Sequence, residues 1–196
     1  MIAFLACLCL SVPKRYPGVT WGRKDAVIHI EVYVDPLCPD CLAIWPTLKT
    51  VLDKYPTQVN LTLHPFNLPY HTWAYYMVRA IYALVSYDET LGKQFIDALY
   101  TGEQNQFSNS ALENIGESSI PAKILNYIAN KYGISEKDLE THFNDETVRS
   151  QAATGFTFAA AHAVDGTPTV FINGVMTDID PDTSISSWVS IIDDLL

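Results

Sequence analysis

The feature that most constrains this chain is a β-branched apolar segment followed at once by a helical one. In residues 27–34 (VIHIEVYV), isoleucine or valine occupies every second position from 28 to 34, and the other face is mixed. Such near-continuous apolar character is typical of a central strand that is covered on both sides, as in an α/β sheet. A turn at residues 35–37 ends the strand, and apolar side chains recur at helical spacing over residues 38–55. The pattern therefore predicts a helix directly after a buried strand.

Two cysteines, Cys38 and Cys41, lie at the start of that predicted helix. A thiolate at a helix N-terminus faces unpaired backbone N–H groups and the positive end of the helix dipole, which lowers its pKa. Pro39 suits the first helical position because its missing N–H group needs no partner there. Cys41 lies one turn further in and is expected to stay protonated to higher pH. We predict that Cys38 is the attacking thiol and Cys41 the resolving thiol of a redox-active pair.

A second motif lies far along the chain. Gly166, Thr167 and Pro168 precede the apolar segment 169–172, and an Asn-Gly pair at 173–174 predicts a tight hairpin turn. A proline at this place is either an ordinary edge proline or a cis-proline that turns the Thr167 backbone toward a substrate. The Cys38/Cys41 pair favours the second interpretation.

The N-terminal segment 1–15 begins with an apolar run over residues 1–12, too short to cross a membrane, and contains Cys7 and Cys9. This pattern suggests a secretory signal peptide, and a buried N-terminal segment is the alternative. A signal peptide would place the protein in the secretory pathway or an extracellular or periplasmic-type compartment; the alternative location is cytoplasmic. Cleavage would leave Cys38 and Cys41 as the only thiols, so we expect neither a disulfide framework nor a zinc site.

The length of 196 residues fits one domain, or one domain that carries an insertion. A formal net charge of −10 argues against a nucleic-acid partner, because phosphate would be repelled. The composition is that of a globular chain, and no stable membrane insertion is expected.

The middle of the chain is predicted to be helical. Apolar side chains at helical spacing predict several helices in this part of the chain. The polar stretch at residues 103–119 separates them and is expected to be a loop. A helix near the C-terminus closes the chain. The predicted helices span residues 73–86, 91–100, 120–132, 136–143, 145–163 and 184–195.

These motifs together resemble the thioredoxin superfamily, and within it the DsbA-like branch. The resemblance rests on Cys38-Pro39-Asp40-Cys41 after a strand, on Pro46, on GTPTVFING at residues 166–174, and on HPFNLPYH at residues 64–71. It implies an α/β thioredoxin fold, in which a central mixed sheet is flanked by helices and an α-helical domain is inserted. The implied division is a first thioredoxin part at 16–71, the insertion at 72–147 and a second thioredoxin part at 148–196.

The same resemblance implies the activity. It implies a thiol–disulfide oxidoreductase that acts on protein or peptide thiols and disulfides, with Cys38 as nucleophile and Cys41 as resolving cysteine. Thr167 and Pro168 would form the substrate-binding turn. No cofactor and no metal are implied, whereas a redox partner, not identified by the sequence, must recycle the dithiol. Oxidant, reductase and isomerase share these motifs.

Two positions depart from the pattern of the family. Many DsbA-like oxidants have histidine where this chain has Asp40, and a carboxylate ~8 Å from the Cys38 thiolate raises its energy by at most ~2 kcal/mol. We therefore predict a weaker oxidant than a Pro-His version. Thioredoxin-fold enzymes often bury a carboxylate beneath the dithiol, and Glu31 is the candidate here, with Asp35 nearer to Cys38. Glu31 is offset by one residue from the usual spacing, which reverses its face of the strand unless the turn compensates.

Two other function classes fit the sequence. A related thioredoxin-fold branch contains glutathione-dependent transferases and isomerases with a similar helical insertion, but serine commonly replaces the first cysteine there. A non-catalytic thioredoxin-fold chaperone or scaffold would have no need of both cysteines or of Thr167-Pro168. A glutathione-conjugation assay tests the first alternative, and a disulfide-exchange assay on Cys38→Ala tests the second.

Overall fold

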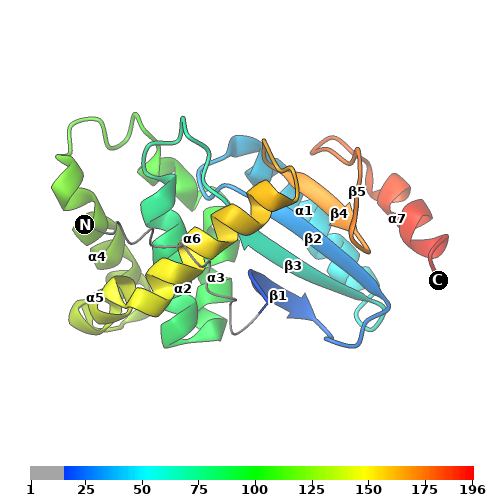
Figure 1. Cartoon of the computed structure of the whole chain (residues 1–196), viewed down its shortest axis with the longest axis horizontal. Coiled ribbons are helices and arrows are strands. Elements are labelled where there is room, and N and C mark those ends of the chain that lie inside the picture. Colours follow the sequence, from blue (N-terminus) through cyan, green and yellow to red (C-terminus); the bar gives the residue numbers. More distant parts are fainter. Residues whose placement is uncertain (1–15) are drawn as a thin grey trace, which may run out of the picture.

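A five-stranded mixed sheet forms the centre of the computed structural model, which describes residues 16–196 (Figure 1). Strands β2 and β3 run parallel, and the three other neighbouring pairs are antiparallel. The spatial order β1-β3-β2-β4-β5 makes β2 the central strand, as its apolar pattern predicts. The strands are β1 (Val19–Gly22), β2 (Ile28–Val34), β3 (Val59–Pro65), β4 (Thr169–Ile172) and β5 (Val175–Met176).

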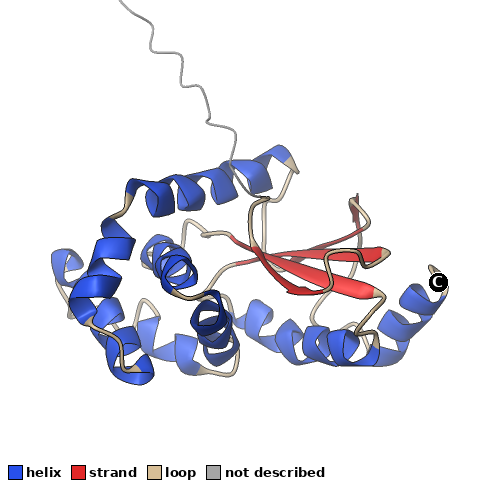
Figure 2. Cartoon of the chain, turned by 90° about the horizontal axis from the view of Figure 1, so that it is seen from below, coloured by secondary structure: helices blue, strands red, loops and turns tan. Residues whose placement is uncertain are grey.

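Helices cover both faces of this sheet, as Figure 2 shows. Helices α1 (Pro39–Lys54) and α7 (Ile185–Asp193) lie together on one face, where the Tyr55 hydroxyl donates to Asp193 Oδ1 at 2.6 Å. Helix α6 (Glu146–Ala161) covers the other face, and its Phe158 ring stacks on Tyr33 of β2 with centroids 6.4 Å apart. Because both faces are covered, β2 needs apolar side chains on each of them.

A cluster of helices lies between β3 and α6 in the chain and beyond one end of the sheet in space (Figure 1). It consists of α2 (Ala74–Tyr87), α3 (Glu89–Leu99), α4 (Ile120–Tyr132) and α5 (Glu136–Asn144), with the short 3-10 helices η1 (Glu103–Phe107) and η2 (Glu117–Ser119). Helix α2 is its centre and packs against the other three α-helices and α6. These elements fall within the predicted insertion 72–147, and the division into domains stays a prediction.

The ends of the helices follow local capping chemistry. Gly133 ends α4 with a left-handed φ of 65°, and the Ser135 side chain caps α5 by accepting from Asp138 N, so α4 ends and α5 begins at the residues predicted for them. The Asp88 carboxylate accepts from Leu91 N, so α3 begins at Glu89, two residues before the predicted start. The polar stretch 103–119, predicted as a loop, contains η1 and η2.

The predicted hairpin turn joins β4 to β5. Asn173 and Gly174 both have left-handed φ values, 49° and 79°, which are the values that a type I′ turn requires. The four-residue strand β1, which pairs antiparallel with β3, was not predicted, because four residues are too few to show a period of two.

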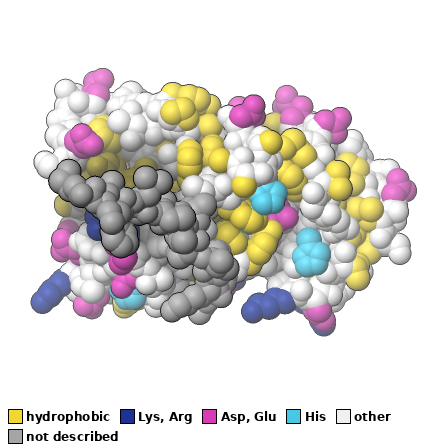
Figure 3. Space-filling view, viewed as in Figure 1, with side chains coloured by type: hydrophobic (Ala, Val, Ile, Leu, Met, Phe, Trp, Pro, Cys, Tyr) yellow, Lys and Arg dark blue, Asp and Glu magenta, His cyan; other side chains and the backbone are white. Residues whose placement is uncertain are grey.

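The predicted signal peptide falls in residues 1–15, which lie outside the described residues. In residues 16–196, no helix is both long enough and apolar enough to span a bilayer. Aspartate and glutamate side chains are spread over the face seen in Figure 3 and do not gather in one patch. The net charge of −10 is thus distributed on this face, as in a solvated acidic surface.

Candidate active site

The dithiol lies where β2 passes into α1. Cys38 is the N-cap of α1, with an extended backbone at φ −75° and ψ 125°, and Pro39 takes the first helical position. Both cysteines are free thiols, and Cys38 and Cys41 are only 4% and 0% exposed. The strand–turn–helix pattern of the sequence therefore places Cys38 at the helix N-terminus, as predicted.

The two thiols have opposite acidities. The Cys41 thiol donates to Cys38 sulfur, and the Thr167 hydroxyl and the backbone N–H groups of Cys41 and Asp40 also favour its thiolate. These contacts outweigh burial and lower the pKa of Cys38 to about 6. Burial, followed by the hydrogen bond and the charge of Cys38, raises the pKa of Cys41 well above its ordinary value. At neutral pH the pair therefore holds a reactive thiolate at Cys38 and a protonated thiol behind it.

This difference predicts how alkylation of the dithiol depends on pH. The reaction of iodoacetamide with Cys38 should rise with pH around a midpoint of about 6, while Cys41 stays unreactive. The folded pKa lies below the unfolded value of about 8.5, so the thiolate stabilises the reduced protein above that pH. This contribution is lost as the pH falls through 6. Peptide mapping by mass spectrometry measures each cysteine, and a midpoint near 8.5 for Cys38 would contradict the geometry.

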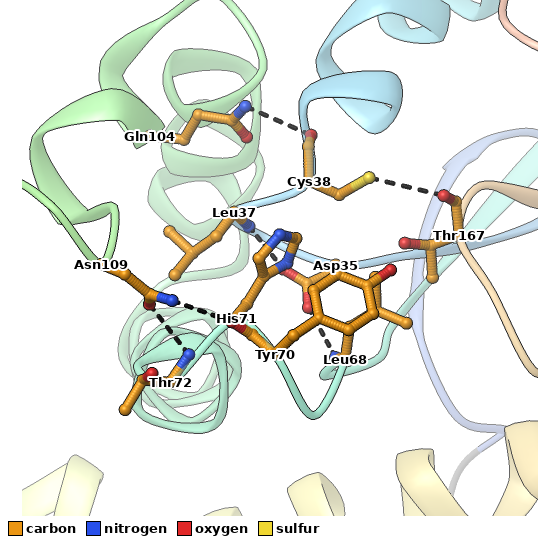
Figure 4. Close-up of polar contacts among 10 residues, drawn as sticks. All are labelled: Asp35, Leu37, Cys38, Leu68, Tyr70, His71, Thr72, Gln104, Asn109 and Thr167. Atoms are coloured by element: carbon orange, nitrogen blue, oxygen red, sulfur yellow. Dashed lines mark hydrogen bonds and ion pairs between the residues drawn. The ribbon is translucent and has the colours of Figure 1, made fainter.

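The turn at Thr167-Pro168 faces the dithiol across 129 residues of sequence. The Thr167–Pro168 peptide bond is cis, and the Cys38 thiol donates to the Thr167 carbonyl oxygen at 3.4 Å (Figure 4). The Thr167 hydroxyl is buried and has no other hydrogen-bond partner, so it is free to donate to the thiolate. The structure thus brings together Cys38, Cys41, Thr167 and Pro168.

A buried carboxylate lies beside this site, and it belongs to Asp35. Its Oδ1 accepts from Leu37 N at 2.7 Å and its Oδ2 from Leu68 N at 2.6 Å, while His71 Nδ1 lies 3.1 Å from Oδ1 (Figure 4). Asp35 is 0% exposed, and this burial raises its pKa despite the hydrogen bonds. Asp35 therefore ties the turn before Cys38 to the loop that follows β3.

The structure does not bring Glu31 to the dithiol. Its carboxylate accepts from the Tyr16 hydroxyl at 2.6 Å and lies 3.0 Å from His64 Nε2, and the hydrogen bond with His64 is the main cause of its lowered pKa. Glu31 shares its side of the pleat with Tyr33, which packs on α6, whereas α1 covers the opposite face. The one-residue offset is not compensated by the turn. The expectation that Glu31 tunes the active site is corrected accordingly.

Two residues of the polar stretch 103–119 contact the site or the loop beside it, and neither was predicted. Gln104 of η1 is 3% exposed, and its Nε2 donates to the Cys38 carbonyl oxygen at 3.2 Å. Asn109 donates to the Tyr70 carbonyl oxygen at 2.8 Å and accepts from Thr72 N at 3.0 Å. Both belong to the polar stretch 103–119. The composition of this stretch gives no indication that its side chains contact residues 39 or more positions earlier in the chain.

Pro39 and Asp40, between the cysteines, are both exposed at the start of α1. Asp40 contributes its backbone N–H group to the Cys38 site, and its carboxylate faces solvent. Among residues 16–196, no group of three or more histidine, cysteine, aspartate or glutamate side chains could hold a metal ion.

The exposed carboxylate of Asp40 predicts a shift in redox potential. Replacing it in Asp40→His removes a negative charge near the Cys38 thiolate, which stabilises the reduced form. We expect the reduction potential of the dithiol to become less negative by roughly 15–40 mV, because solvent screens part of the interaction. Asp40→Asn, the control for charge alone, should shift it less in the same direction. Equilibration with glutathione buffers measures the potential. An unchanged potential in both variants would show that the Asp40 carboxylate does not tune the dithiol.

A free dithiol at the N-terminus of the helix that follows the central strand, faced by a cis-proline turn, defines a thioredoxin-fold protein. The family model described as thioredoxin matches residues 14–194, and the chain belongs to this family. A search of curated protein sequences finds no match.

Solved structures with the same fold include DsbA-like proteins. A provisionally assigned protein-disulfide isomerase from Pseudomonas syringae has a TM-score of 0.76 at 20% identity, over 89% of this chain and 97% of that one. BdbD from Bacillus subtilis has a TM-score of 0.71 at 16% identity, over 91% and 92%. The thiol–disulfide exchange protein alpha-DsbA2 from Wolbachia pipientis has a TM-score of 0.64 at 15% identity, over 91% and 87%. At these identities the likeness establishes the fold, a DsbA-like thioredoxin fold, as predicted.

Proposed function

We propose that this protein is a thiol–disulfide oxidoreductase that acts on protein or peptide disulfides. The observation that carries the proposal is the unequal pair of thiols: Cys38 with a pKa lowered to about 6, and the buried Cys41 behind it. A low-pKa thiol next to a second thiol is the arrangement that disulfide exchange needs. Cys38 is the nucleophile and Cys41 the resolving cysteine.

In the reducing direction, the Cys38 thiolate attacks one sulfur of a substrate disulfide. A mixed disulfide forms, and the other substrate sulfur leaves as a thiolate. Cys41 then loses its proton and attacks the Cys38 sulfur, which releases the second substrate thiolate and leaves a Cys38–Cys41 disulfide. The substrate gains two electrons and the dithiol loses two. The same steps in reverse transfer the disulfide to a substrate.

Thr167 and Pro168 form the substrate-binding turn in this proposal. The Thr167 carbonyl oxygen already lies 3.4 Å from Cys38 sulfur, so an extended substrate segment in the mixed disulfide would run beside this backbone. The Thr167 hydroxyl supports the Cys38 thiolate as a hydrogen-bond donor. Pro39 and Asp40 tune the acidity of Cys38 from the rim.

The proposal extends to domains, partners and location. The segments 16–71 and 148–196 supply the dithiol and the proline turn, and the insertion 72–147 supplies Gln104 and Asn109. No cofactor takes part, since the electrons pass between sulfur atoms, and a separate redox partner recycles the dithiol. The apolar run at the N-terminus supports a secretory or periplasmic-type compartment.

Reduction of insulin in the presence of dithiothreitol tests the proposal. The protein should accelerate the precipitation of the insulin B chain, and it should show no glutathione conjugation to an electrophilic substrate. Absence of insulin reduction together with glutathione conjugation would favour the transferase alternative. Suppression of aggregation that persists in Cys38→Ala, without any exchange activity, would favour a chaperone.

A further inference from the structure

An exposed aromatic ring stands at the rim of the dithiol. Tyr70, in the loop after β3, is 64% exposed. The Tyr70 and His71 rings are arranged edge to face, with their centroids 4.8 Å apart, and His71 Nδ1 lies 3.1 Å from Asp35 Oδ1. Asp35 in turn holds the N–H group of Leu37, the residue before Cys38. Three consecutive contacts therefore fix the ring relative to the active-site turn.

Asn109 holds the backbone on both sides of His71. Its side-chain amide donates to the Tyr70 carbonyl oxygen at 2.8 Å and accepts from Thr72 N at 3.0 Å, much as a neighbouring strand would (Figure 4). This double contact comes from the helical insertion and fixes the loop that bears Tyr70. A ring held in place before binding loses little conformational freedom when a partner packs on it.

The Tyr70 ring extends from its loop with the hydroxyl on the side of Thr167 (Figure 4). Desolvation, followed by the charges of Cys38 and Asp35, raises the pKa of Tyr70, so the phenol is neutral at physiological pH. The Tyr70 ring is therefore an uncharged apolar surface with one hydroxyl donor, and the charged group that shares the rim with it is the carboxylate of Asp40. The ring suits an apolar side chain of a polypeptide, and neither the ring nor Asp40 offers a positive charge to the carboxylates of glutathione.

We propose that Tyr70 is a specificity-determining residue that packs against an apolar side chain next to the substrate cysteine that exchanges with Cys38. This inference rests on the proposed function and names its substrate class: polypeptide segments in which an apolar residue flanks the reactive cysteine. Asn109 is a positioning residue for the same contact, since it holds the backbone of Tyr70.

The test compares three disulfides as substrates of the full chain. Two peptides, each closed by one disulfide, differ only in having leucine or serine beside the same cysteine, and glutathione disulfide is the third. The leucine peptide disulfide should oxidise the Cys38–Cys41 dithiol of the wild type about fivefold faster than the serine peptide disulfide does. This ratio is the one expected for a partly buried aliphatic side chain. Tyr70→Ala should reduce this preference to less than about twofold and leave the rates with the other two substrates unchanged.

Two further variants make the result specific. Tyr70→Phe should keep the preference, because the ring remains. Tyr87→Ala is the control, since Tyr87 is also an exposed tyrosine, 39% exposed, and lies at the end of α2. A leucine preference that survives in Tyr70→Ala, or an equal loss with all three substrates, would overturn the inference. A wild type that exchanges with none of the three would instead overturn the proposed function.

Discussion

Replacing Cys38 with serine should lower the rate of disulfide exchange at least about a thousandfold. A serine hydroxyl is not ionised near neutral pH, so Cys38→Ser lacks the nucleophile that the lowered pKa of Cys38 provides. The variant should fold normally, because serine is close in size to cysteine and suits an N-cap position. Insulin reduction and exchange with a peptide disulfide both measure the loss.

Cys41→Ser is the matched control for this result. It keeps the Cys38 nucleophile but lacks the resolving thiol, so it should form a mixed disulfide with the substrate and not release it. Mass spectrometry should find the substrate attached to the peptide that contains Cys38. Full activity of Cys38→Ser, or a mixed disulfide that forms at Cys41 in Cys38→Ser and not at Cys38 in Cys41→Ser, would contradict the assignment of the two roles.

Removing the Asp35 carboxylate should destabilise the fold by about 2–4 kcal/mol. Asp35→Ala leaves the N–H groups of Leu37 and Leu68 without the acceptors that they have at 2.7 and 2.6 Å. Each buried hydrogen bond to a charged acceptor is worth about 1.5–3 kcal/mol, and the cost of burying the carboxylate offsets part of this. The free energy of unfolding from urea denaturation measures the effect, and the slope with denaturant should stay unchanged.

Two substitutions bracket that prediction. Asp35→Asn keeps one acceptor and should lose about half as much, whereas the exposed Asp40→Ala should change stability by less than about 0.5 kcal/mol. If Asp35→Ala were as stable as Asp40→Ala, Asp35 would not be the link between the active-site turn and the loop after β3.

The parts of the site that could be predicted are those with a local sequence signal. The strand before Cys38, the helix after it and the Asn173-Gly174 turn each follow from periodicity or turn chemistry within a few residues. The Thr167-Pro168 turn, which faces the dithiol, could be predicted because the motif that resembles the family is contiguous there, at residues 166–174. All of these are found in the structure.

The parts that could not be predicted are contacts between distant segments. Gln104 contacts Cys38 across 66 residues and Asn109 contacts Tyr70 across 39, and neither has a hydrophobic period that would reveal its partner. Glu31 shows the converse error: it is a carboxylate on the strand before Cys38, but it is offset by one residue from the usual spacing, and the pleat directs it to Tyr16 and His64 on the other face. Asp35 takes the buried position because the turn, and not the strand, brings it inward.

Titration of the Cys38–Cys41 couple against glutathione buffers tests the central claim most directly. After acid quenching and alkylation, peptide mapping gives the fraction of the two cysteines that is joined as a disulfide. We predict one reversible two-electron transition, in which Cys38 and Cys41 are oxidised together and follow the ratio of squared glutathione to glutathione disulfide. If both thiols stayed reduced at every ratio, or each were glutathionylated independently, the pair would not be a redox-active dithiol.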